Sequence, residues 1–264
     1  MAISPSLIRK SFNRAARSYD TSAQVQNQCA EYIADKLPPL NQCRILDLGC
    51  GTGNLVPYLL NMNPSFYLGI DLSEKMLMKA RKKTRVNPYF HYICSDISSY
   101  LRANTSQFDC IVSNATMQWL EMNDDFLQNL CHALTPKGSL LFSYFLPTTF
   151  QQLKTVMEAV EEKEVSMICD NFLPGNSVKS RFDSFFVPVV HKELHYEIYY
   201  RNIRELLQSI RKTGISPLNS PAMNLSRKKL HLLEEEYKRR YDHLVLSYKV
   251  DFFYYKSRTI SSNT

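Results

Sequence analysis

Glycines at alternate positions follow a short apolar segment near residue 45. The segment ILDL (45–48) leads into Gly49, Gly51 and Gly53, and a helical pattern begins soon afterwards. Glycine lets the backbone approach a ligand closely, and the amide groups at the start of a helix can bind a carboxylate or a phosphate. The spacing is G-x-G-x-G, whereas the dinucleotide fingerprint is G-x-G-x-x-G, so this loop disfavours a pyrophosphate ligand.

Polar residues stand at the ends of the next three expected strands. Asp71 ends the second strand, where a carboxylate can accept hydrogen bonds from both hydroxyl groups of a ribose. Asp96 follows the third strand with Ile97 beside it, which could cover an adenine ring, and Asn114 ends the fourth. Each polar residue alone is typical of a helix cap or a turn. Together they occupy the carboxyl ends of successive strands and therefore predict one ligand crevice.

An alternation of strands and helices positions these residues and indicates βαβ units with a parallel sheet. The expected strands are 44–48, 66–70, 90–94, 108–113 and 139–145, and the expected helices between them are 54–60, 73–83 and 124–134, with a turn at 135–138. Residues 6–37 predict one or two amphipathic helices. Beyond Pro147 the sequence predicts helices at 149–164, 202–212 and 226–240 and short strands at 187–190 and 249–255.

The composition bounds the class of protein. The chain has 264 residues, 44% of them hydrophobic, which suffices for one core domain with an appended lobe. No run of about 18 apolar residues predicts a membrane span, and no secretion signal is visible, so we expect a cytoplasmic protein without membrane association. The seven cysteines are odd in number and lack C-x-x-C spacing, so we expect free thiols and no metal site.

The positive charge predicts an anionic partner. The formal net charge is +7 and the isoelectric point is near 9.0, which is compatible with nucleic acid, a membrane surface or an acidic protein. The basic excess is clearest between Lys192 and Arg240. A solvated helix surface is an equally good interpretation of this segment.

The ordered set of motifs resembles class I S-adenosylmethionine-dependent methyltransferases. The motifs are LDLGCGTGNL, GIDLS, SDIS, FDCIVSN and LTPKGSLLF, within residues 44–145. The resemblance implies a Rossmann-like α/β core with a mostly parallel seven-stranded sheet flanked by helices. It implies that glycines 49 and 51 lie against the methionine part of S-adenosylmethionine, that Asp71 holds the ribose and that Asn114 faces the methyl-transfer site. The residues implied to bind the cofactor are Asp47, Gly49, Gly51, Gly53, Asp71, Leu72, Asp96, Ile97 and Asn114.

Motifs outside this core are similar to those of the malonyl-acyl-carrier-protein O-methyltransferases. Residues 12–20 fit the family signature F-x-R-A-A-x-x-Y-D, and further matches lie at 113–119, 171–174, 209–214 and 246–254. The resemblance implies methylation of the free carboxylate of a malonyl thioester on acyl carrier protein, the step that opens biotin synthesis. Two departures concern the acceptor: Asn171 stands where the family usually has Arg, and Arg211-Lys212 makes its segment more basic.

The family resemblance also implies a division of the chain and a set of catalytic residues. Residues 1–40 would form lid helices, 41–147 the cofactor-binding core, and 148–264 a helical acceptor lobe with the strands that complete the sheet. A malonyl carboxylate is ionised at neutral pH and needs no general base, so a dry pocket that aligns it with the methyl group suffices. The expected catalytic residues are Tyr19, Asn114, Trp119 and Arg211.

Alternative functions remain open at this point. The acceptor could be a small carboxylic acid or a quinone precursor, or the chain could be a non-catalytic S-adenosylmethionine-binding partner protein. Nucleic acid is disfavoured because no RNA-recognition signature is present, and Tyr196, Tyr199 and Tyr200 are expected to pack in a strand. We expect a monomer whose Arg211 and Lys212 dock the acidic carrier protein.

Overall fold

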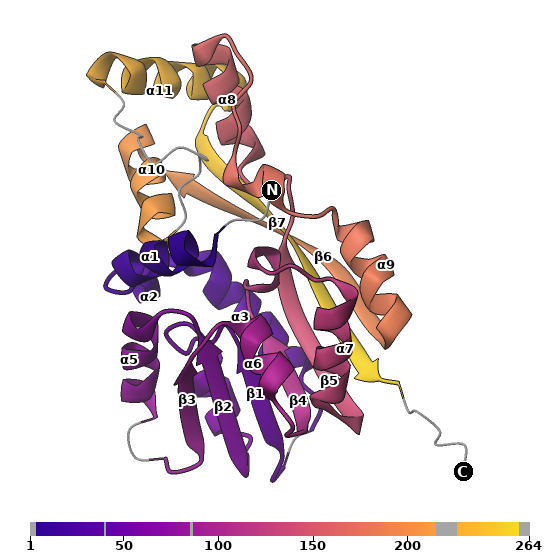
Figure 1. Cartoon of the computed structure of the whole chain (residues 1–264). Helices are drawn as coiled ribbons and strands as arrows, with labels where there is room; N and C mark the ends of the chain where they lie inside the picture. Colours follow the sequence, from indigo (N-terminus) through magenta and orange to yellow (C-terminus); the bar gives the residue numbers. More distant parts are fainter. Residues whose placement is uncertain (1–3, 40, 85–86, 215–225, 259–264) are drawn as a thin grey trace.

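A seven-stranded sheet forms the centre of the computed structural model, which describes residues 4–39, 41–84, 87–214 and 226–258 (Figure 1). The strand order is β3-β2-β1-β4-β5-β7-β6. The first five strands in this order run parallel, and β7 runs antiparallel to both β5 and β6. The bounds are β1 (Arg44–Leu48), β2 (Phe66–Asp71), β3 (Phe90–Cys94), β4 (Phe108–Ser113), β5 (Leu134–Phe145), β6 (Phe186–Tyr200) and β7 (Leu244–Ser257). The predicted fold class is confirmed.

The start of β5 differs from the prediction. A turn was expected at 135–138, but β5 already begins at Leu134, which pairs with Phe108 of β4. The register then shifts between Phe108 and Cys110, and the Thr135 hydroxyl donates a hydrogen bond to Asp109 Oδ1 at 3.3 Å. A bulge therefore absorbs the residues with turn character into the strand.

The two last strands are much longer than the short segments expected. Their pairing runs from Phe186 opposite Ser257 to Tyr200 opposite Leu244. Strand β6 lies at the sheet edge and is largely exposed, so its charged residues hide the strand pattern in the sequence. The expected strand position of Tyr196, Tyr199 and Tyr200 is confirmed.

The N-terminal segment forms three helices where one or two were expected: α1 (Pro5–Ala15), α2 (Tyr19–Ser22) and α3 (Gln24–Lys36). The first break falls at Ser18, whose Oγ donates hydrogen bonds to the main-chain oxygens of Ala15 and Lys212. A serine that bonds the backbone in this way competes with helix continuation. The second break falls at Ala23, which has non-helical backbone angles.

The remaining helices cover the sheet and extend beyond it. They are α4 (Val56–Leu60), α5 (Glu74–Lys83), α6 (Ile97–Ala103), α7 (Asp124–His132), α8 (Gln151–Glu161), α9 (Gly175–Phe185), α10 (Ile203–Lys212) and α11 (Arg227–Tyr241). Helices α6 and α9 were not predicted; α6 has only seven residues, and each of the two helices buries only two. Helix α10 lies beside α1 and α2, whereas α8 and α11 pack together further out (Figure 1).

The central strands of the sheet are buried on both faces, as is typical of parallel strands covered by helices. Alternate residues of β1 illustrate this: Leu46 and Leu48 belong to one apolar cluster and Ile45 belongs to the other. All seven cysteines are free, as expected, and five of them are buried. No helix among the described residues has the length and apolar character needed to cross a bilayer.

Candidate active site

The site lies where the chain order of the sheet reverses, because β1 has β2 on one side and β4 on the other. At such a point the loops after neighbouring strands diverge and leave a crevice at their carboxyl ends. The crevice contains a cavity with about 690 Å³ of empty space, open solvent at its mouth included, which we call the main cavity. It brings together the predicted residues Tyr19, Gly49, Gly51, Asp71, Leu72, Asp96, Ile97, Asn114 and Trp119.

The glycine loop has the backbone that its sequence predicts. Gly49, Gly51 and Gly53 have φ angles of 74°, 55° and 79°, in the left-handed region that favours glycine. A Cβ atom on Gly49 would lie 2.2 Å from Thr116 Oγ1, so the approach of Thr116 requires glycine there. Gly53 lines neither the main cavity nor the side pocket described below, and a Cβ atom there would face Val56 at 3.0 Å.

Asp71 joins the glycine loop to the start of α5. Its Oδ2 accepts a hydrogen bond from Gly51 N at 2.9 Å, and its Oδ1 accepts one from Ser73 N at 2.7 Å. Burial raises the pKa of the Asp71 carboxyl to about 6, against the opposing effect of the two backbone bonds. The carboxylate is therefore mainly ionised at neutral pH, and its remaining lone pairs can accept hydrogen bonds from a ligand in the main cavity.

Asp47 lines a side pocket of about 270 Å³ that also includes Tyr19 and Asn114. Its Oδ2 accepts a hydrogen bond from the Tyr67 hydroxyl at 2.8 Å, but its buried Oδ1 has no partner among the described residues. Burial raises the pKa of this carboxyl to about 7, with a further rise from the charge of Asp71. A buried carboxylate oxygen without a partner is costly, so this pocket suits a cationic ligand group.

Asp96 and Ile97 start α6 at the edge of the main cavity. Asp96 Oδ1 accepts a hydrogen bond from Ser99 N at 2.8 Å, so this carboxylate is the N-cap of α6. The capping role weighed for Asp96 from sequence is therefore real, and the residue still lines the cavity. Ile97 is buried and contributes an apolar wall beside Leu72.

Asn114 lines both the main cavity and the side pocket, and both ends of its side-chain amide are hydrogen-bonded. Its Nδ2 donates to the main-chain oxygen of Gln26 at 2.8 Å, and its Oδ1 accepts from Ser143 Oγ at 2.8 Å. The residue thus fixes α3 to the carboxyl ends of β4 and β5. This contact makes Asn114 a positioning residue as well as a wall of the site.

Aromatic side chains close the site. Tyr19 lines both cavities, and burial together with the charge of Asp71 raises the pKa of its hydroxyl, which stays protonated at neutral pH. Trp119 packs edge-on against Phe12 of α1 and against Phe172, with ring centroids 6.1 Å and 5.2 Å away. The buried Trp119 Nε1 has no hydrogen-bond partner in the described part of the chain.

Several lining residues were not predicted from the sequence. Helix α1 contributes Pro5, Ile8 and Phe12, and the loop after β4 contributes Thr116. The i, i+4 spacing of Ile8 and Phe12 is typical of the apolar face of a helix, and it does not indicate that this face covers a cavity. Thr116 lies within the family match at 113–119, but that match assigned it no role.

Arg211 does not join the other three predicted catalytic residues. It is exposed in the last turn of α10 and lines neither the main cavity nor the side pocket. Asn171 is exposed as well, and its Nδ2 donates to the main-chain oxygen of Ile168 at 3.2 Å. Arg211 and Asn171 therefore lie outside both cavities.

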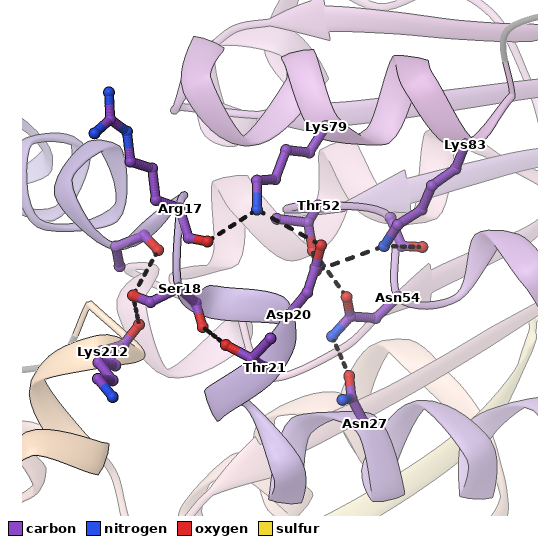
Figure 2. Close-up of polar contacts among 12 residues, drawn as sticks. Arg17, Ser18, Asp20, Thr21, Asn27, Thr52, Asn54, Lys79, Lys83 and Lys212 are labelled. Carbon is purple, nitrogen blue, oxygen red and sulfur yellow. Dashed lines mark hydrogen bonds and ion pairs between the residues drawn. The ribbon is translucent and has the colours of Figure 1, made fainter.

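Polar contacts fasten the N-terminal helices over the glycine loop (Figure 2). Asp20 of α2 accepts a hydrogen bond from the Thr52 hydroxyl and forms ion pairs with Lys79 and Lys83 of α5, at 3.8 and 3.6 Å. Lys79 also donates to the main-chain oxygen of Arg17 at 3.2 Å. These contacts hold Tyr19 at the cavity wall.

Comparisons with known proteins agree with this geometry. Residues 46–142 match a family model described as a methyltransferase domain. Over most of the chain the fold resembles the YcgJ protein from Bacillus subtilis (TM-score 0.59, 12% identity, 88% of this chain and 98% of the other). It also resembles geranyl diphosphate C-methyltransferase from Streptomyces coelicolor A3(2), solved with S-adenosyl-L-homocysteine (TM-score 0.52, 13% identity, covering 86% of this chain and 74% of the other). The class is therefore that of the methyltransferases with a seven-stranded α/β sheet.

Two curated relatives narrow the class. A malonyl-[acyl-carrier protein] O-methyltransferase from Bacillus anthracis is 34% identical over 248 residues, covering 89% of this chain and 91% of the relative. Another, from Halalkalibacterium halodurans, is 30% identical over 255 residues, covering 91% and 93%. The chain belongs to the family of malonyl-[acyl-carrier protein] O-methyltransferases.

Proposed function

We propose that this chain transfers a methyl group from S-adenosylmethionine to the free carboxylate of a malonyl thioester on acyl carrier protein. The product is the malonyl methyl ester, which enters the pimeloyl part of biotin synthesis. The observation that carries the proposal is the near full-length similarity to relatives of that name. A cavity lined by polar groups at the carboxyl ends of the strands supports the proposal.

The described residues fit S-adenosylmethionine. The unpartnered Asp47 Oδ1 and the side pocket suit the ammonium group of the methionine part. The Asp71 carboxylate suits the ribose hydroxyls, and the apolar walls Leu72 and Ile97, with Asp96 at the edge, suit the adenine ring. The glycines leave room for the ligand against the backbone of the loop.

The reaction requires that the carboxylate be aligned with the methyl group and that water be excluded. S-adenosylmethionine supplies an electrophilic methyl group when bound. The ionised carboxylate is itself the nucleophile. Its negative charge and the positive charge of the sulfonium group neutralise each other as the methyl group moves. A cation bound to the carboxylate would therefore stabilise the ground state more than the transition state. Neutral donors avoid this cost, and the protonated Tyr19 hydroxyl and the unpartnered Trp119 Nε1 are such donors. The ring of Phe12 excludes water beside them.

We assign Arg211 and Lys212 to contact with the carrier protein. Both side chains are exposed at the end of α10, outside the main cavity. An exposed cation there is suited to an acidic surface and poorly suited to the reacting carboxylate. This assignment replaces the expected orienting role of Arg211.

Mass spectrometry of the acceptor tests the proposal. Malonyl-loaded carrier protein, incubated with the chain and S-adenosylmethionine, is expected to gain the mass of one methyl group, and carrier protein without the malonyl group is the control. Free malonate and a quinone precursor are run in parallel. Turnover on a free acid or a quinone precursor without any gain on the carrier would favour the other acceptor class. No methyl transfer to any of these acceptors would favour a non-catalytic cofactor-binding protein.

A further inference from the structure

Helix α1 has two chemically different faces. Pro5, Ile8 and Phe12 line the main cavity, whereas the basic side chains of the helix are exposed. Residues 4–19 contain no Asp or Glu. The exposed basic residues in this stretch are Arg9, Lys10, Arg14 and Arg17.

The end of α10 adds two more cations beside the end of α1. Ser18 Oγ donates a hydrogen bond to the main-chain oxygen of Lys212 at 3.1 Å, which joins the two helix ends (Figure 2). A Cβ atom on Gly214 would lie 3.0 Å from the Phe12 ring and 3.1 Å from Ala15, so the chain after α10 packs on α1. We call the exposed side chains of Arg9, Lys10, Arg14, Arg17, Arg211 and Lys212 the cationic surface.

The charge of α1 is not neutralised locally. Within the part of the chain that the structure describes, no carboxylate lies within ion-pair distance of Arg9, Lys10, Arg14 or Arg17. Helix α11 carries six Lys and Arg residues, but four of them are paired with glutamates: Lys229, Lys238, Arg239 and Arg240. The positive charge of α1 is therefore available to an external partner, whereas most of the positive charge of α11 is neutralised by ion pairs within the protein.

We propose that the cationic surface docks the acidic face of the acyl carrier protein, so that the helix covering the cavity is also the helix that the carrier contacts. The inference rests on the proposed function. Exposed apolar side chains accompany the cations, since Leu7 of α1 and Met78 of the neighbouring α5 are 59% and 55% exposed. Such anchors fit a protein partner. Single-stranded RNA would instead use exposed aromatic rings, and those of the described chain, Tyr89 and Tyr199, lie on other elements.

Neutralisation of two cations, Arg14 of α1 and Arg17 just after it, tests the docking surface, and the doubly substituted protein is called the α1 variant. The variant Arg14→Gln/Arg17→Gln is compared with Arg102→Gln/Lys137→Gln, which removes the same charge at exposed positions outside both cavities. Stopped-flow association with unloaded, pantetheine-bearing carrier protein is measured at low and high salt. The α1 variant is expected to associate about tenfold more slowly at low salt, and the control less than about twofold. The gap closes at high salt, and Arg14→Lys/Arg17→Lys restores the rate.

A second substrate separates failure of docking from failure of the proposed function. Methyl transfer to a malonyl thioester of a short thiol lacks the carrier protein, so the α1 variant and the wild type are expected to be equally active on it. Equal association rates for the α1 variant and the control overturn the inference, as does a gap that persists at high salt. Binding of a short single-stranded RNA as tight as that of the carrier overturns it as well. Failure of the wild type to methylate either malonyl substrate contradicts the proposed function. The association rates still show whether the cationic surface binds the carrier protein.

Discussion

Gly49 and Gly51 differ in what surrounds them although both have positive φ. A Cβ atom on Gly49 would meet three side-chain atoms of Thr116 at 2.2 to 2.6 Å, whereas the nearest atom to a Cβ on Gly51 is 4.0 Å away. We expect Gly51→Ala to lower the free energy of unfolding by about 1 kcal/mol, from backbone strain alone. Gly49→Ala is expected to lower it by at least about 2 kcal/mol, because overpacking adds to the strain.

Urea denaturation of both variants checks this prediction. Thr116→Gly in the Gly49→Ala background removes all three contacting atoms, so it is expected to recover part of the loss. Equal losses for the two single variants would contradict the packing assigned to Thr116.

Asp47 makes the stability of the ligand-free protein depend on pH, in a direction that follows from its raised pKa. Its pKa is raised to about 7 by burial, above the ordinary value near 3.9, so the folded state binds this proton more tightly than the unfolded state. The stability that the group contributes is present below pH 4 and is lost as the pH rises towards 7. Asp47→Asn removes this loss, and the variant is expected to gain melting temperature relative to wild type between pH 5 and pH 8.

Scanning calorimetry without ligand measures the effect. Asp35→Asn, at an exposed position of α3, serves as the control. Melting temperatures of wild type and Asp47→Asn that run parallel across this pH range would refute the titration assigned to Asp47.

At this residue scale the sequence predicted the parts of the site that motifs carry. Asp71 and Asn114 could be predicted because each ends a strand with a clear apolar pattern. Phe12 begins the family signature at 12–20, but the signature assigned it no role in the site, and an apolar residue on an amphipathic helix looks the same whether it covers a core or a cavity.

At the scale of elements, one carboxylate holds the N-terminal helices to the core. Asp20 contacts Thr52, Lys79 and Lys83, and its side chain is 36% exposed. Because such pairs contribute little to global stability, Asp20→Ala is expected to cost less than about 1 kcal/mol of unfolding free energy. It is expected to speed hydrogen exchange over residues 5–22 and to weaken cofactor binding by roughly threefold to tenfold, since α1 and Tyr19 line the cavity.

Exchange mass spectrometry and calorimetry check these two effects. Asp170→Ala removes an ion pair with Lys154 that is similarly exposed but distant in sequence from α1, and it serves as the control. Unchanged exchange over residues 5–22 in Asp20→Ala would refute the fastening role of Asp20.

Elements were predictable where burial is regular. Strands β1, β3 and β4 have the predicted bounds, and most residues of each are apolar. Helix α6 was missed because only Ile97 and Leu101 are buried, and the length of β6 was underestimated because an edge strand needs few apolar residues.

At the scale of the whole molecule, the parallel direction of the first five strands follows from the alternation of strands and helices. The insertion of β7 between β5 and β6 does not, because it depends on pairs such as Phe186 with Ser257 that are far apart in the chain. Only the family resemblance indicated that the last strands complete the sheet. The arrangement places α1, α2 and α10 together beside the crevice, which unites the proposed lid and docking surface (Figure 1).

The central claim is that the methyl group goes to a carboxylate oxygen of the malonyl thioester. The most direct test uses S-adenosylmethionine with a ¹³C-labelled methyl group, malonyl-loaded carrier protein and NMR spectroscopy of the product. We expect one new signal from a methyl carbon bonded to oxygen, with the malonyl methylene still carrying both of its protons. A labelled methyl carbon bonded to carbon or nitrogen, or no labelled product on the carrier protein, would contradict the account.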